Sequence, residues 1–318
     1  MLGVGPRFDA PVPPGGYLWW YVDGLSECGR FGLSVIAFVG SVFSPYYAWS
    51  GRKSPENHVC INVALYAPSG NRWAMTERGR EALSRNAESF RVGPSSLTWQ
   101  DGALVLNLDE RAVPRPPKEW YPERLRCRIQ LIPKAVTRRQ FCIDAQGDHN
   151  WWPIAPLADI SVEFEGARES WTGHGYLDSN WGLEPLEYGF EYWDWARGVL
   201  PDGRAVLIYD VNRKDKTRHC LSLTASEDGA ISEHDKPAKS SLPHGFWRMK
   251  RSGHHDEGAA AEVLSTLEDS PFYMRSKLKT QLLGQPVELI HESLSGDRYA
   301  SPLVKLMLPW RMPRRSGW

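Results

Sequence analysis

The sequence predicts an all-β fold with few helices, arranged as two tandem β-sandwich or barrel domains. Apolar and polar residues alternate through 124–131 and again through 160–165, the period of a strand with one buried face. Asp-Gly pairs such as 101–102 fall between such runs and favour tight turns. The best helical candidates, 76–86 and 271–283, are short and weakly patterned, so strands dominate the prediction.

For the N-terminal 50 residues we predict an irregular segment followed by a buried strand or hairpin. Residues 1–16 contain no apolar region of a secretory signal, so we expect a loose leader on a protein that is not secreted. Residues 31–50 carry no charge over a length that could span a bilayer. Glycine, serine and proline interrupt this stretch and its apolar residues are β formers, which favours a buried strand over a membrane helix.

The rest of the first half is less regular. A proline-rich interruption at 114–117 divides it, and the alternating runs predict a β-sandwich or barrel. We place the end of this domain after Gly182-Leu183-Glu184-Pro185, which gives an N-terminal domain at 1–186 and a C-terminal domain at 187–318.

The number of strand-like runs in the second half of the sequence predicts a β-barrel. Eight strand-like runs follow the boundary, at 190–199, 204–212, 218–225, 245–251, 260–267, 271–277, 286–294 and 301–309. Eight antiparallel strands make a lipocalin-type up-and-down barrel, whose interior can hold one apolar ligand. Together with the first half, this predicts two tandem lipocalin-like domains.

The C-terminal stretch 302–318 combines apolar residues, a tryptophan and several arginines. This composition is typical of a segment that rests in a membrane interface. It is equally compatible with a final β-strand and a solvated basic tail, and both interpretations stay open.

Composition limits the kinds of partner. Lysine plus arginine and aspartate plus glutamate both number 38, so there is no net field to hold a nucleic acid. The five cysteines include no C-x-x-C pair, which favours reduced thiols in a cytoplasmic protein over disulfides or a zinc site. The 15 tryptophans are more than usual for a chain of this length. We therefore expect a partner that is recognised by its shape and its apolar surface rather than by charge.

No common cofactor or nucleophile motif is present. The sequence has no P-loop, no phosphate-binding G-x-G-x-x-G, no H-E-x-x-H and no G-x-S-x-G. The close histidine pair His254-His255 lies in a polar run, where an exposed turn is expected rather than a set of metal ligands. We therefore expect neither a cofactor nor a metal.

A cluster of polar and aromatic residues at 171–182 is the first candidate site. If the segment is extended, His174, Tyr176 and Asp178 share one face of a strand. An apolar aromatic setting disfavours the charged form of a carboxyl, so Asp178 is expected to stay protonated above its reference pKa of about 3.9 and to act as a general acid. The alternative is a glycine-rich turn in which Asp178 and Asn180 bond to their own backbone and the aromatics form core.

A second cluster, at 147–153, places His149 and Trp151 on one face by the same spacing. Asp144 and Asp148 are the alternatives for the acid, although their loop-like surroundings favour solvated roles.

Several segments resemble one known family, the carotenoid 1,2-hydratases or hydroxyneurosporene synthases of purple photosynthetic bacteria. The matching segments are Tyr21-Val22-Asp23, 34–49 (SVIAFVGSVFSPYYAW), 57–80 with NVALY and RWAMTERGR, 148–153, and 173–187 with GHGYLDSNWG. They fall within about 17–200, and beyond about 215 the barrel prediction rests on strand counting alone. The resemblance implies cofactor-independent hydration of the terminal 1,2 double bond of acyclic carotenoids, such as neurosporene or lycopene, to 1-hydroxy carotenoids.

The resemblance also implies a set of catalytic residues. These are His149, Trp151, Tyr176 and Asp178. From the chemistry of alkene hydration we expect Asp178 to protonate the alkene, and Trp151 and Tyr176 to stabilise the carbocation. His149 would position water, tune Asp178 or make a structural hydrogen bond. Their neighbours in the two clusters are expected to bind the substrate, namely Trp152, Trp171, His174 and Trp181. An acyclic carotenoid and water are the expected reactants, and the protein is expected in the cytoplasm, peripherally associated with the inner or photosynthetic membrane.

Three other functions stay open. They are a lipocalin-like carotenoid or lipid carrier without turnover, a pericyclase or isomerase of the same two-domain group, and a glycosidase, which would need two facing carboxylates. Product mass and the uptake of labelled water distinguish these functions. The sequence predicts no oligomeric state.

Overall fold

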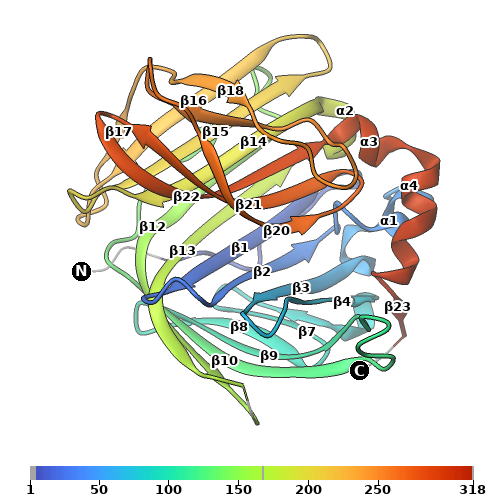
Figure 1. Ribbon diagram of the computed structural model, residues 1–318. Helices are drawn as coiled ribbons and strands as arrows, with labels where there is room; N and C mark the ends of the chain where they lie inside the picture. The colour runs from blue at the N-terminus through green and yellow to red at the C-terminus, as the bar shows by residue number, and fades with distance from the viewer. Residues whose placement is uncertain (1–4, 167, 317–318) are drawn as a thin grey trace. The chain divides into compact units, whose positions relative to one another are not determined.

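Strands dominate the computed structural model, which describes residues 5–166 and 168–316 (Figure 1). Its helical segments are α1 (Pro45–Trp49), α2 (Leu186–Gly189), α3 (Gly296–Ala300) and α4 (Pro302–Met307), with 3-10 turns η1 (Pro55–Asn57), η2 (Arg80–Ala82) and η3 (Leu308–Trp310). The shortness of these helices confirms the predicted all-β fold class.

The described chain divides into two compact units. The first contains the residues up to Gln140, Asn150–Pro185 and the residues from Leu306 on, and the second contains Phe141–His149 and Leu186–Lys305. The division into 1–186 and 187–318 stays a prediction.

One large sheet forms the first unit. Its strands are β1 (Tyr17–Ser26), β2 (Gly32–Val39), β3 (Val59–Tyr66), β4 (Arg72–Met75), β5 (Glu77–Arg78), β6 (Leu83–Arg85), β7 (Ser89–Val92), β8 (Ser95–Gln100), β9 (Ala103–Ala112), β10 (Glu123–Pro133), β12 (His149–Phe164), β13 (Trp171–Gly182) and β23 (Arg314–Arg315). The strand order is β23-β5-β3-β2-β1-β13-β12-β10-β9-β8-β7-β6, with β4 paired to β3 and the short β11 (Phe141–Cys142) paired to β12. Hydrogen bonds therefore place β1, β13 and β12 side by side at the middle of the sheet.

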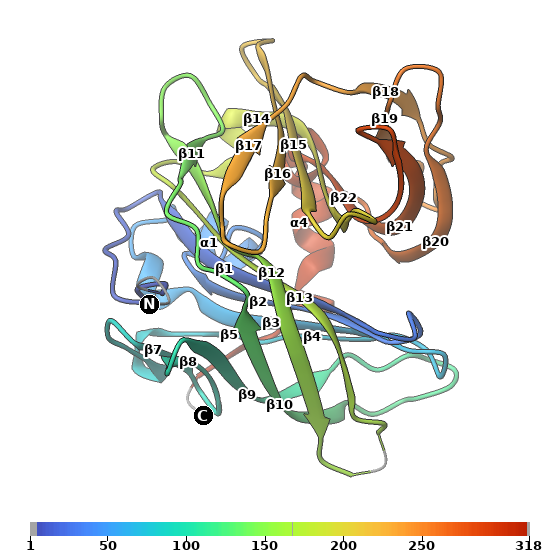
Figure 2. The ribbon, with the colours of Figure 1, turned by 90° about the vertical axis from the view of Figure 1, so that its left-hand side faces the viewer.

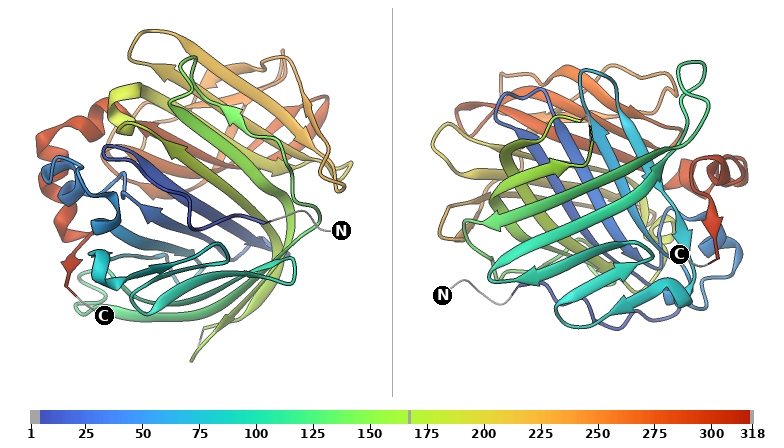
Figure 3. Two further views of the ribbon diagram at one scale, coloured as in Figure 1. Left: turned by 180° about the vertical axis from the view of Figure 1, so that it is seen from behind. Right: turned by 90° about the horizontal axis from the view of Figure 1, so that it is seen from below.

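The sheet of the first unit is strongly curved, as Figures 2 and 3 show. A backbone hydrogen bond of 2.9 Å from Val113 N to Trp73 O ties the end of β9 to β4. A buried ion pair of 3.2 Å between Arg78 and Glu110 joins β5 to β9. The apolar side chains on the inner face, from Leu18 of β1 to Leu177 of β13, form one continuous core.

Sequence patterns located many of these strands correctly. The alternating apolar residues of β10 are buried, and Asp101 and Gly102 adopt positive φ values of 52° and 76° in the turn between β8 and β9. The expected loose leader is wrong at Phe8, which is fully buried with its ring centroid 4.8 Å from that of Trp20.

The uncharged stretch 31–50 contains the buried strand β2 followed by the short helix α1, in agreement with the preference for a strand. Among the residues that the structure describes, no helix is long and apolar enough to cross a membrane.

The second unit is built on a smaller antiparallel sheet. Its strands are β14 (Phe190–Val199), β15 (Ala205–Arg213), β16 (Arg218–Ala225), β17 (Ile231–Glu233), β20 (Glu262–Asp269), β21 (Tyr273–Leu282) and β22 (Gln285–Ser295), in the order β17-β16-β15-β14-β22-β21-β20. A separate pair is formed by β18 (Ala238–Ser241) and β19 (Ser252–His255). Apolar residues including Ile208, Leu242 and Leu278 make a core of their own.

Two of the strands predicted for the second half are wrong. The run 301–309 forms α4 and η3, because Leu303, Leu306, Met307 and Trp310 follow the helical spacing i, i+3, i+4, i+7. The run 245–251 is a loop, since Arg248 has a φ of 51° and interrupts any extended conformation.

Both helical candidates are wrong. Residues 76–86 form β5, β6 and only the three-residue turn η2, because β5 pairs with β3 and β23. Residues 271–283 contain β21, which pairs with β22 around a turn at Leu283 and Gly284, both with positive φ.

Candidate active site

The strand β13 carries the centre of the candidate site, and its glycines explain why it fits there. A Cβ atom on Gly173 would come within 2.0 Å of the carbonyl oxygen of Leu25, the neighbour in β1. A Cβ atom on Gly175 would meet Leu131 and Ile160 of the core at 3.0 and 3.1 Å. The backbone contact at Gly173 requires glycine so that β13 can lie against β1, and the tight side-chain contacts at Gly175 favour glycine there.

The two faces of β13 have different surroundings. Leu177 points into the core of the first unit, so Tyr176 and Asp178 point to the opposite face of the sheet. Tyr176 is fully buried and Asp178 is 3% exposed. Trp151 of β12, the strand next to β13, is also fully buried. A face that carries an acid and two polar aromatics is thus shielded from water.

Two donors converge on one oxygen of Asp178. The indole Nε1–H of Trp151 donates to Oδ2 at 2.9 Å, and the hydroxyl of Tyr176 donates to the same oxygen at 2.8 Å. Burial, and then the nearby Asp178 carboxylate, raise the pKa of Tyr176 well above its ordinary value. Tyr176 therefore keeps its proton and stays a donor. The structure brings together three of the four residues that the sequence proposed as catalytic.

A second tyrosine and aspartate pair lies beside this group on β1. The hydroxyl of Tyr21 donates to Oδ2 of Asp23 at 3.1 Å, and Asp23 is fully buried. Tyr21 is the register partner of Asp178, and Asp23 is the register partner of Tyr176. Asp23 was not predicted as a site residue, although Tyr21-Val22-Asp23 has the same Tyr-x-Asp spacing as Tyr176-Leu177-Asp178.

His149 belongs to the second unit. It is fully buried, and its ring centroid lies 4.5 Å from that of Phe190. Burial lowers the pKa of His149 to about 4, and the charge of Arg213 adds to the lowering while Asp144 opposes it. The imidazole is therefore neutral at neutral pH. Asp144, one alternative for the acid, forms an ion pair of 2.7 Å with Arg213.

The residues predicted to bind substrate lie elsewhere on the first unit. Trp152, Trp171 and Trp181 pack against the inner core, on the face of the sheet opposite to Asp178. Trp152 and Trp181 line a cavity of about 620 Å³, whose wall also contains Tyr17, and Trp171 lines another of about 330 Å³. His174 is exposed near the start of β13.

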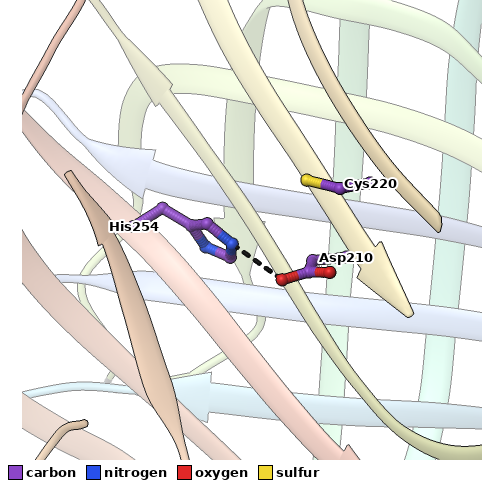
Figure 4. A group of neighbouring side chains, drawn as sticks. All are labelled: Asp210, Cys220 and His254. Carbon is purple, nitrogen blue, oxygen red and sulfur yellow. Dashed lines mark hydrogen bonds and ion pairs between the residues drawn. The ribbon is translucent and has the colours of Figure 1, made fainter. Parts of the chain in front are cut away.

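The second unit contains a group that could hold a metal by distance alone. The ligand atoms of Asp210, Cys220 and His254 lie within 4.8 Å of one another (Figure 4). However, Asp210 already binds Lys239 at 3.0 Å, His254 at 3.0 Å and Arg218 at 2.7 Å. Burial raises the pKa of the Cys220 thiol to about 11, so it is a poor ligand. The donor set fits a buried ion-pair cluster better than a metal centre.

The same region corrects one sequence expectation. His254 and His255 are not in an exposed turn, because they lie in β19 with exposures of 1% and 8%. The hydrogen bond of 3.0 Å between His254 Nε2 and Asp210 Oδ2 explains why His254 is found inside the fold.

Comparison with known proteins places the chain in a family. Residues 35–318 match the family described as carotenoid hydratase CrtC. The chain is 49% identical over 317 residues to the acyclic carotenoid 1,2-hydratase of Thiocapsa roseopersicina, covering 98% of this chain and 76% of that protein. It is 46% identical over 316 residues to the acyclic carotenoid 1,2-hydratase of Rubrivivax gelatinosus, with the same coverage. For that of Rhodobacter capsulatus the identity is 41% over 286 residues, 89% of this chain and 99% of that protein.

Solved structures share the fold at low sequence identity. A protein assigned to AttH from Nitrosomonas europaea has a TM-score of 0.56 at 15% identity, covering 88% of this chain and 92% of that one. Kievitone hydratase from Nectria haematococca has a TM-score of 0.52 at 9% identity, covering 93% and 94%. These two likenesses support the fold class.

Proposed function

The chain belongs to the CrtC family of carotenoid hydratases and is a hydro-lyase, and from this premise we propose that it hydrates the terminal 1,2 double bond of acyclic carotenoids. Neurosporene and lycopene are the proposed substrates, and 1-hydroxy carotenoids the products. The observation that carries the proposal is the buried Asp178 carboxyl with two donors on one oxygen.

Asp178 is the proposed acid. An isolated trisubstituted alkene offers no polar group to activate, so the reaction depends on a strong acid that protonates C2 and leaves a tertiary cation at C1. The hydrogen bonds from Trp151 and Tyr176 stabilise the carboxylate that remains after proton transfer.

Trp151 and Tyr176 have a second proposed role, because their rings can steady the cation. A desolvated cation over an aromatic face gains about 2 kcal/mol. The hydrogen bond from Trp151 Nε1 to Asp178 fixes the indole next to the acid, where the cation would form. No further reagent is needed for this step besides a proton and water.

His149 remains the proposed residue for placing the water or tuning the acid. Two features support this role: the imidazole is neutral at neutral pH, and it lies two residues before Trp151 in the chain. A neutral imidazole can accept a hydrogen bond from water, which a charged one cannot.

Incubation with lycopene in ¹⁸O-labelled water tests the proposed reaction. A hydratase adds the mass of one labelled water to the carotenoid. A carrier returns the pigment unchanged, and an isomerase or pericyclase changes its spectrum or retention without a change in mass. Either of these two results would contradict the proposal.

We further propose that α4 and η3 bring the protein to an anionic lipid surface, where its substrate is dissolved. One face of this helical segment is exposed to solvent and apolar, with Leu303 at 68%, Leu306 at 65%, Met307 at 38% and Trp310 at 87% exposure. Residues 302–316 contain no acidic residue. Lys305 pairs with Glu187 and Arg314 with Glu77, and the exposed Arg315 is the basic residue that we assign to anionic headgroups.

A further inference from the structure

We propose that Asp23 is the second catalytic carboxyl of this site and takes the proton that water releases as it adds to C1. This inference rests on the proposed hydration and on Asp178 as the acid. It assigns a function to the Tyr21-Val22-Asp23 segment. Asp178 would act as the general acid and Asp23 as the general base.

The pairing of β1 with β13 places the two carboxyls on the same face. Because Asp23 stands opposite Tyr176 in the antiparallel register, their Cβ atoms are expected about 5 Å apart. Asp178 is the diagonal neighbour of Asp23, at roughly 7–8 Å. The rings of Tyr21 and Tyr176 meet edge to face with centroids 6.1 Å apart, which confirms that both dyads share one surface.

Two buried carboxyls on one face of the sheet supply the two groups that the addition of water requires. Asp23 is 0% and Asp178 3% exposed. One would act as the proton donor to C2 and the other as the proton acceptor from water.

Each reaction cycle then balances. The O–H bond of the protonated Asp178 carboxyl breaks and a C2–H bond forms, which leaves the cation at C1. A lone pair of water forms the C1–O bond, and one proton of that water passes to the Asp23 carboxylate. The product leaves as the neutral alcohol. Asp23 then releases its proton to solvent water and Asp178 takes one up, which returns the pair to its starting state.

A deuterium experiment separates the two roles. The full chain is incubated with lycopene in D₂O, and mass spectrometry follows both the hydrated product and the deuterium in the recovered lycopene. In Asp23→Asn, we expect hydration to fall about 100-fold, while protonation by Asp178 and its reversal still exchange deuterium into the substrate. In Asp178→Asn, we expect both hydration and exchange to be lost.

The ratio of hydration to exchange decides the proposal. A wild-type ratio in Asp23→Asn would overturn it, and so would complete loss of exchange in an Asp23→Asn protein with the wild-type circular dichroism spectrum. If that variant does not fold, Asp23→Glu replaces it, because a shifted carboxylate should lower the ratio below wild type without abolishing hydration. An unchanged ratio in Asp23→Glu then overturns the proposal. A wild-type protein that yields neither hydration nor exchange would instead refute the proposed function.

Discussion

The indole N–H of Trp151 donates to Oδ2 of Asp178 at 2.9 Å, across the pairing of β12 with β13. The two residues are 27 positions apart in the chain. This contact joins the two clusters that the sequence marks as candidate sites. Because the hydrogen bond couples the acid to the indole ring, substitution of either residue should affect catalysis.

Removal of the acid should abolish hydration. Asparagine has the shape of aspartate and can still accept from Trp151 and Tyr176, but it carries no proton to give to C2. We expect Asp178→Asn to hydrate lycopene about 1,000-fold more slowly, as for loss of an essential general acid. Product formation is measured by chromatography, and the thermal midpoint reports the fold. Near wild-type turnover in a folded variant would exclude Asp178 as the acid.

Substitution of Trp151 can separate its hydrogen bond from its ring. Trp151→Phe keeps an aromatic face and loses the N–H donor, so we expect turnover to fall about 10- to 100-fold, the equivalent of one hydrogen bond to a charged group. Trp151→Leu loses both features and should be slower still. In each variant turnover should fall more than substrate binding, measured by quenching of tryptophan fluorescence. Equal losses would mean that Trp151 only lines the site.

Acid should destabilise the protein through His149. Its pKa is about 4 in the folded state against 6.5 as the ordinary value, so the unfolded chain binds the proton more readily between these two values. Stability is therefore full above pH 6.5 and declines as the pH falls toward 4, by roughly 2 kcal/mol between pH 7 and pH 5.

Urea denaturation of wild type and His149→Gln at pH 7 and pH 5 measures this effect. Glutamine does not titrate, so the variant should lose less stability over the same interval, by about the same 2 kcal/mol. Identical pH dependence in the two proteins would show that His149 does not titrate with a lowered pKa.

The sequence predicted strands such as β10, in which one face is buried and the other is exposed to solvent. In β10 the period of two is complete, because the side chains alternate between core and solvent. The pattern failed at 301–309, where Leu306, Leu308 and Trp310 alternate as in a strand. Leu303, Leu306, Met307 and Trp310 also repeat as in a helix, and period alone did not separate the two.

In the candidate site, the sequence could predict contacts between residues of one strand but not contacts between residues of different strands. The hydrogen bond from Tyr176 to Asp178 follows from a spacing of two residues. The bond from Trp151 depends on the pairing of β12 with β13, and the position of Asp23 depends on the register of β1, neither of which a periodicity reveals. The opposite placement of Trp152 and Trp181 follows from alternation along their strands, which the clustering of tryptophans in the sequence concealed.

Binding to lipid vesicles should depend on the exposed face of α4 and η3. Each large apolar side chain that leaves water on insertion contributes about 1.5–3 kcal/mol, so the double change Leu306→Ser, Trp310→Ser should weaken binding to vesicles that contain phosphatidylglycerol at least about 10-fold. Leu264→Ser is the matched control, because Leu264 is an exposed leucine (44%) on β20 of the second unit. Cosedimentation measures the bound fraction. Equal binding by the double variant and wild type would show that this face does not enter the membrane surface.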